Sequence, residues 1–285
     1  MAALPIPEGS PPSTGEVGAG TAGLDPTDYA TPGVHEVTLP IDGVDRVYEL
    51  LVPASYDGSK PVPLVLAFHG FTMTPSQMIR GSWGELAEEY GFVLAAPAGL
   101  DKQWAVAQTE EEAAVQLPTS EVDLARHPKG DQDVLFAAGV LADVTEFLRV
   151  DSDRIFVTGE SLGGFMASRV ACELGEHFAG LGPNYNSLLY SQPCSTDVDF
   201  AVVTVGHAQD SVHTIEDAEA AALLWAQHNG CKDGDPVRSE FGENIERAEF
   251  ESCPPDTPVV MVVHEYSWAG EADERVIWET FEAIP

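Results

Sequence analysis

A serine between two glycines is the residue in this chain best placed to do chemistry. Gly159-Glu160-Ser161-Leu162-Gly163 is a GxSxG pattern that follows the apolar stretch Ile155–Thr158 and opens a stretch with helical spacing. A strand that turns sharply into a helix at such a pattern is typical of a nucleophile elbow, which holds the serine hydroxyl exposed at the strand's carboxyl end. The bare pattern arises often by chance, and a Gly-rich loop without catalysis is the alternative. The strand and helix around it favour a nucleophile.

A serine hydroxyl needs a base to take its proton and a carboxylate to orient that base. In folds with such an elbow, the chain order is serine, acid and then histidine, each after its own strand. Asp210 follows the apolar stretch Phe200–Val205, and His264 follows the last apolar stretch, Val259–Val263. We therefore expect Asp210 to accept a hydrogen bond from the ring of His264, and His264 to serve Ser161.

Other side chains compete for these two roles. His207 and His213 flank Asp210, but they precede a helix and do not follow the last strand. His264 could equally be a histidine at the edge of the core, and Asp210 a surface acid near a helix.

The oxyanion that forms during acyl transfer needs backbone N–H donors. One donor is expected from Leu162, the residue directly after the serine, and the other from the loop after the apolar stretch Pro63–Phe68. In that loop, His69-Gly70-Phe71, we choose the N–H of Phe71. The ring of His69 is expected to hold the loop and to take no part in catalysis.

Apolar runs and helical spacing alternate along the chain and must position these residues. We expect strands at 35–41, 46–52, 63–68, 92–96, 155–158, 200–205 and 259–263, and helices at 75–90, 132–148, 162–174, 214–229 and 274–283. Residues 101–131 indicate a long irregular loop, a kind that is usually functional or mobile. Strands alternating with helices predict an α/β fold with a mostly parallel sheet covered by helices on both faces.

Composition excludes several classes of function. The 285 residues include 47 Asp and Glu but only 13 Lys and Arg, for a net charge of −34. Such a surface repels phosphate backbones, so nucleic-acid binding is close to excluded, and anionic membranes are disfavoured. No apolar run is long enough to span a membrane. The acidity is either a solubilising surface or an adaptation to high salt, in which case the melting temperature should rise with NaCl.

The four cysteines show no metal-ligand spacing. Equal separations of 22 residues favour two local disulfides, Cys172–Cys194 and Cys231–Cys253, out of three possible pairings. Disulfides would place the protein in an oxidising compartment. Four reduced, buried thiols in a cytosolic enzyme are the alternative.

The chain is expected to have two parts. Residues 1–33 are rich in Pro, Gly, Ser and Thr and predict a flexible tether, and residues 34–285 predict one catalytic domain. No export signal opens the sequence, and a plausible history is that one was trimmed and Met1 added. We therefore expect a secreted or cell-surface protein, and a monomer.

Several stretches together resemble the secreted polyhydroxybutyrate depolymerase-like and feruloyl esterase-like enzymes of the α/β-hydrolase superfamily. The resemblance spans about residues 35–283 and rests on YELLVP, the FHGF turn, GFVLAAPAGL, DRIFVTGESLGGFMA, ACELGEHFAG, the WAQHNGC stretch and HEYSW followed by VIWETFEAI. It implies an α/β-hydrolase fold without a large lid domain, and a bridge between Cys231 of NGC and Cys253.

The chain departs from this group at two places. The group often has GGH before a Trp, whereas here His264 enters directly and a gap-free alignment on Trp268 puts Tyr266 at the histidine position. A shortened loop restores His264, which we prefer. The group's HGTxD reads Gly206-His207-Ala208-Gln209-Asp210 here, so substrate preference in that loop is open to change.

The resemblance implies a serine carboxylic-ester hydrolase that works through an acyl-enzyme, without metal or cofactor. Its substrates would be feruloyl or other acyl esters or polyesters, in an open cleft with Trp104, Tyr266 and Trp268 as candidate aromatic walls. Ordinary loop packing is the alternative for each of the three. A serine peptidase on the same fold and a catalytically silent polymer- or carbohydrate-binding protein remain the rival functions.

Overall fold

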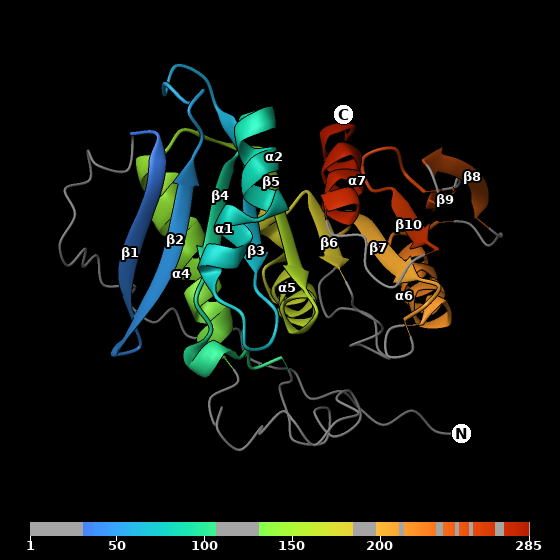
Figure 1. Cartoon of the computed structure of the whole chain (residues 1–285), viewed down its shortest axis with the longest axis horizontal. Helices are drawn as coiled ribbons and strands as arrows, with labels where there is room; N and C mark the ends of the chain where they lie inside the picture. The colour runs from blue at the N-terminus through green and yellow to red at the C-terminus, as the bar shows by residue number, and fades with distance from the viewer. Residues whose placement is uncertain are drawn as a thin grey trace.

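A single ten-stranded sheet organises the protein. The computed structural model describes residues 31–106, 131–184, 198–210, 214–231, 236–242, 245–250, 253–265 and 271–284. The strand order is β1-β2-β4-β3-β5-β6-β7-β10-β9-β8 (Figure 1). The strands are β1 Gly33–Ile41, β2 Val44–Val52, β3 Val62–Phe68, β4 Val93–Pro97, β5 Val150–Glu160, β6 Gly180–Asn184, β7 Ala201–His207, β8 Val237–Gly242, β9 Ile245–Glu249 and β10 Val259–His264.

The centre of the sheet is parallel and its two edges are antiparallel. Each neighbouring pair from β4 through β3, β5, β6 and β7 to β10 runs parallel. The hairpin β1–β2 joins one edge, and β9 with β8 joins the other. All the parallel strands therefore end at the same edge of the sheet, where α/β proteins bind ligands.

Helices cover both faces, as the alternation of strands and helices predicts. The helices are α1 Pro75–Arg80, α2 Ser82–Tyr90, α4 Gln132–Phe147, α5 Leu162–Glu173, α6 Ile215–His228 and α7 Glu271–Glu282, and two short 3-10 turns are η1 Leu100–Lys102 and η3 Gly175–His177. Side chains of α4, α5 and α6 form one core with alternate strand residues such as Leu64 and Leu66. Those of α1, α2 and α7 form a second core with the intervening residues, such as Val65 and Ala67. This architecture is the α/β-hydrolase fold.

Most predicted elements are present, and three differences have clear causes. The helix predicted over 75–90 is two helices, because Gly81 between them has an extended backbone. Strand β6 has the sequence GLGPN, whose glycines and proline disfavour a strand locally. The edge strands β8 and β9 carry polar and charged side chains, so no apolar pattern predicts them.

Parts of the predicted organisation lie outside the described residues. Residues 1–30 of the expected tether and 107–130 of the expected long loop belong to this portion. Among the described helices, none is long and apolar enough to cross a membrane.

One predicted disulfide is confirmed. Cys231, directly after α6, is bonded to Cys253, before β10. Cys172 in α5 is also disulfide-bonded, whereas Cys194, its predicted partner, lies outside the described residues.

Candidate active site

The GxSxG pattern forms the sharp strand-to-helix turn that the sequence predicts. Ser161 has φ 51° and ψ −116°, between the end of β5 at Glu160 and the start of α5 at Leu162. A positive φ is rare for a residue with a side chain and stores strain, which is common at functional sites. The N–H of Ser161 donates to the carbonyl oxygen of Asn184 at the end of β6, and this bond helps to hold the strained turn.

Glycine is required on both sides of the serine. A Cβ on Gly159 would lie 2.1 Å from the carbonyl oxygen of Gly163, and a Cβ on Gly163 would lie 2.0 Å from that of Phe68. Both distances are far below van der Waals contact. The elbow can therefore close against the end of β3 only without these two side chains.

The loop after β3 lies against the nucleophile, as expected for an oxyanion-binding loop. A Cβ on Gly70 would be 3.7 Å from Ser161 Cβ and 3.2 Å from the carbonyl oxygen of Glu160. The N–H groups of Phe71 and Leu162 donate to no other protein group within the described part of the chain. Two backbone donors next to a serine are therefore available to an incoming oxygen.

His69 holds this loop, which confirms the structural role predicted for it. The Gly99 N–H donates to its Nε2 at 3.0 Å, so Nδ1 carries the proton and donates to the carbonyl oxygen of Gly70 at 2.8 Å. Burial lowers the pKa of the His69 ring, which keeps the ring neutral.

Trp104 does not form an exposed wall, and this prediction is corrected. Its side chain is fully buried, its indole N–H donates to the carbonyl oxygen of His69, and its ring packs on Phe68. These contacts show that Trp104 stabilises the loop that follows β3. The other two predicted walls, Tyr266 and Trp268, lie outside the described residues.

The acid beside His264 in the described structure is Asp273, and the pairing of His264 with Asp210 stays a prediction. His264 Nε2 lies 2.6 Å from Asp273 Oδ1, an ion-pair contact too bent to count as a hydrogen bond. Asp210 follows β7 as predicted and is half-buried. His264 is the last residue of β10, and its ring contacts Asp273 of helix α7.

A second histidine shares the same carboxylate. His207 ends β7 directly beside His264, and its Nε2 lies 3.0 Å from Asp273 Oδ2. The two rings stack, with centroids 5.6 Å apart, and all three side chains are buried. Sequence reasoning considered His207 only as a rival base and missed Asp273. The signal for Asp273 was its place near the start of the last helix, which packs across the strand ends.

The nucleophile and the histidines are not joined in this structure. Ser161 Oγ makes no hydrogen bond to a histidine within the described residues. Strand order places β6 and β7 between β5 and β10, about 14 Å at the usual strand spacing. His207 stands one strand closer to Ser161 than His264 does.

The electrostatics of this strand edge favour an ionised carboxylate on Asp273. Burial by itself would raise the pKa of Asp273, but contacts from His207 and His264 outweigh it and lower the pKa to about 2. Glu160, next to Ser161, has its pKa raised by burial and also by the negative charge of Asp273. The negative charge of Asp273 therefore contributes to the raised pKa of Glu160, the residue directly before Ser161.

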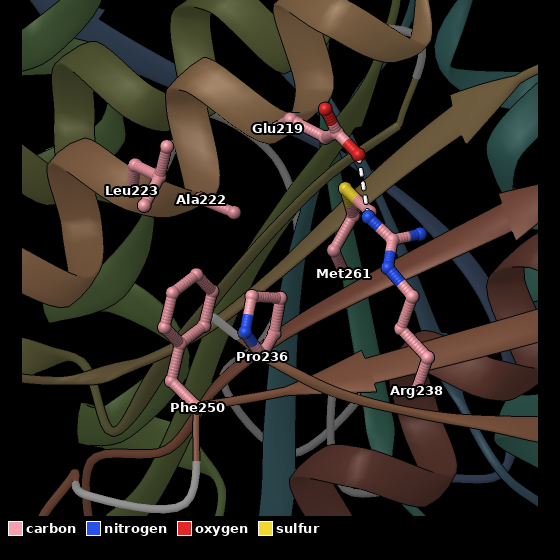
Figure 2. A pocket seen from close by; sticks show the side chains of 7 residues that line it. All are labelled: Glu219, Ala222, Leu223, Pro236, Arg238, Phe250 and Met261. Carbon is pink, nitrogen blue, oxygen red and sulfur yellow. Dashed lines mark hydrogen bonds and ion pairs between the residues drawn. The ribbon is translucent and has the colours of Figure 1, made fainter. Parts of the chain in front are cut away.

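A separate pocket lies away from this edge. It is lined by α6 and the edge strands, with Leu223 and Phe250 opposite Arg238, whose guanidinium pairs with Glu219 (Figure 2). Its residue from β10, Met261, belongs to the core on the α6 face, whereas His264 faces α7. Within the described ranges, no cluster of three or more His, Cys, Asp or Glu side chains is arranged to hold a metal ion.

Comparison with known proteins finds similar esterases. No family model matches the chain. It is similar to Feruloyl esterase D of Neurospora crassa, with 23% identity over 93% of this chain and 84% of that protein. It is also similar to Feruloyl esterase C of Emericella nidulans, with 24% identity over 83% of this chain and 79% of that protein.

A solved structure shows the same fold. The acetyl xylan esterase from Aspergillus awamori superposes with a TM-score of 0.60 at 18% identity, covering 87% of this chain and 99% of that one. The chain is therefore a feruloyl-esterase-like protein with the α/β-hydrolase fold. Together with the nucleophile elbow, these likenesses assign it to the carboxylic-ester hydrolases.

Proposed function

We propose that this protein is a serine esterase that cleaves feruloyl or related acyl esters through a covalent acyl-enzyme. The observation that carries the proposal is the strained elbow at Ser161, next to the backbone N–H groups of Phe71 and Leu162, which donate to no other protein group among the described residues. The names of the similar fungal proteins support an ester of a feruloyl group, and polyesters remain a further substrate class to test.

In the proposed reaction, Ser161 Oγ attacks the ester carbonyl and its proton passes to a histidine. The Oγ–C bond forms, the Phe71 and Leu162 amides hold the oxyanion, and the C–O bond of the alcohol breaks as the histidine returns the proton to it. Water then attacks the acyl carbonyl with the same histidine as base, the Oγ–C bond breaks, and the histidine returns the proton to Ser161 Oγ as the carboxylic acid leaves. His264 is the proposed base, because it ends the last parallel strand and is paired with a carboxylate.

The open gap between Ser161 and His264 sets a condition on this mechanism. Catalytic hydrogen bonds are often long or unformed until substrate is bound. The proposal therefore requires the ring to come within hydrogen-bond distance of Ser161 Oγ in the substrate complex. If it does not, the rival function is a protein that keeps the fold and binds an ester or a carbohydrate without turnover.

Replacing Ser161 by Ala tests the proposal. Removing the only proposed nucleophile should lower kcat for p-nitrophenyl acetate and methyl ferulate by at least about 10³-fold, while the circular dichroism spectrum and melting temperature stay close to those of the wild type. Wild-type turnover in the Ser161→Ala variant would end the hypothesis. A polyester film assayed in parallel decides whether polymers are also substrates.

The site of action is part of the same proposal. A disulfide between Cys231 and Cys253 favours an oxidising compartment, and thus a secreted or cell-surface enzyme.

A further inference from the structure

The loop after β3 is held by a segment from elsewhere in the chain. Residues 98–105 follow β4, and we call them the support segment. They make hydrogen bonds to the loop on both sides of residues 70–71. On one side, the indole N–H of Trp104 donates to the carbonyl oxygen of His69 at 2.8 Å. On the other side, the N–H of Thr72 donates to a carbonyl oxygen of the support segment at 3.1 Å. The position of the loop therefore depends on the position of this segment.

Two buried charges hold the last residue of the support segment, Ala105. Its N–H donates to Asp133 Oδ2 at 2.7 Å, and its carbonyl oxygen accepts from Arg169 Nη1 at 2.6 Å. Both charged side chains are at most 3% exposed, so water does not compete for these bonds. A buried charge is costly unless it is paired and hydrogen-bonded. Each of the two charges therefore favours a single position of the Ala105 backbone.

The two charges come from different helices, and each is fixed by a further ion pair. Asp133 lies on α4, and its Oδ1 accepts from Arg46 of β2 at 2.7 Å. Arg169 lies on α5, the helix that begins directly after Ser161. The Nε of Arg169 donates to Glu173, one turn further along the same helix, at 2.7 Å. The support segment is thus tied to the helix that follows the proposed nucleophile.

We propose that Asp133 and Arg169 are positioning residues of the esterase reaction, which set the place of the Phe71 N–H relative to Ser161 through the support segment. The inference rests on the proposed function, in which Phe71 is an oxyanion donor. Both side chains are buried and act through the backbone of Ala105, so neither touches the substrate.

The rate of acyl transfer is sensitive to the position of an oxyanion donor. A donor stabilises the transition state only when it lies within hydrogen-bond distance of the oxygen that becomes charged. A displacement of about 1 Å costs on the order of 10²-fold in rate. An interaction made in the transition state alone changes kcat and leaves KM nearly constant. A displaced Phe71 N–H should therefore lower kcat.

The first test removes the two charges, one at a time, in the full-length enzyme. The two oxygens of Asp133 serve different donors, and an amide has only one oxygen, so Asp133→Asn cannot serve both Arg46 and Ala105. It should lower kcat for p-nitrophenyl acetate by about 10²-fold and change KM by less than about threefold. Arg169→Met leaves the Ala105 carbonyl oxygen without its donor and should have the same effect.

Inhibition by phenylboronic acid separates positioning from stability. Its boron forms a bond to Ser161 Oγ while the serine proton passes to the base, and the tetrahedral anion that results needs the same N–H donors as the transition state. The inhibition constant should therefore rise by about the factor by which kcat falls. A role in stability alone would lower the melting temperature and leave both constants of the folded enzyme unchanged.

Asp143→Asn is the matched control. Asp143 also lies on α4 and also pairs with β2, since it accepts a hydrogen bond from the Tyr48 hydroxyl. It makes no hydrogen bond to the support segment in the described structure. This variant should keep the wild-type kcat and the wild-type inhibition constant, whatever its melting temperature.

Trp104→Phe keeps an aromatic ring but loses the N–H that bonds to His69, and it should lower kcat by about tenfold. Wild-type kcat in Asp133→Asn or Arg169→Met, or a lower kcat with an unchanged inhibition constant, would overturn the inference. If either of these variants does not fold, the other and Trp104→Phe decide by the same criteria. Ester hydrolysis that survives in Ser161→Ala would instead defeat the proposed function, so the two failures are distinct.

Discussion

Single residues carry both the strain and the charge of the candidate site. A positive φ at a serine costs on the order of 1–3 kcal/mol. A side chain at Gly159 or Gly163 would clash with neighbouring backbone, so the turn around Ser161 requires glycine at both positions. The same turn places the half-buried Ser161 directly before Leu162 and against the loop that carries Phe71. The strained backbone conformation of Ser161 is therefore part of the turn that positions the proposed nucleophile.

The depressed pKa of Asp273 predicts a pH dependence of stability. Its carboxyl titrates near 2 in the folded protein, against 3.8 for an unperturbed one. The unfolded chain therefore binds the proton first as pH falls, so the stabilisation is complete above about pH 4 and is lost as pH falls toward 2. The difference in unfolding free energy between wild type and Asp273→Asn should shrink from pH 5 to pH 2 in urea denaturation. A difference that is constant over this range would contradict it.

The packing of helices against strands determines which site residues come into contact. The sequence predicts the elbow and the oxyanion loop because each is a local pattern, a GxSxG after a strand and a turn after an apolar run. It does not predict the contact of His264 with Asp273, because that contact depends on how α7 docks across β6, β7 and β10. The strand β6 itself escapes prediction, since Gly180 and Gly182 are suited to helix docking and not to strand propensity.

The Cys231–Cys253 disulfide joins the end of α6 to the segment that leads into β10. The cystine closes a segment of 22 residues, so loop entropy predicts a stabilisation of about 3 kcal/mol. A Cys231→Ser, Cys253→Ser double variant should lose roughly this amount in chemical denaturation while it keeps its esterase activity at low temperature. A loss of activity with unchanged stability would instead show that the bridge positions β10 and His264.

At the scale of the whole molecule, the parallel strands bring distant residues to one edge. Strands β5, β7 and β10 belong to the same sheet (Figure 1). Ser161 directly follows β5, His207 and His264 end β7 and β10, and Asp273 of the last helix contacts the two histidines. Alternation of strands with helices was sufficient to predict this fold and the edge at which the residues gather. The pairing of acid and base was not predictable, because Asp210 and Asp273 both lie near that edge and only packing distinguishes them.

The net charge of −34 arises from acidic residues along the whole chain and not from one segment. It disfavours polyanionic partners, which agrees with a neutral ester as substrate. The adaptation of the protein to high salt stays a prediction. If it is correct, added NaCl should raise the melting temperature, because ions screen the repulsion between the acidic side chains.

The most direct measurement is covalent labelling of Ser161 with a fluorophosphonate, followed by mass analysis of the intact protein and of the peptide that contains residue 161. An activated serine forms the Oγ–P bond and releases fluoride, so the wild type should gain one phosphonyl group on Ser161 and the Ser161→Ala variant none. A wild-type protein that stays unlabelled, or that carries the label on another residue, would contradict Ser161 as the nucleophile.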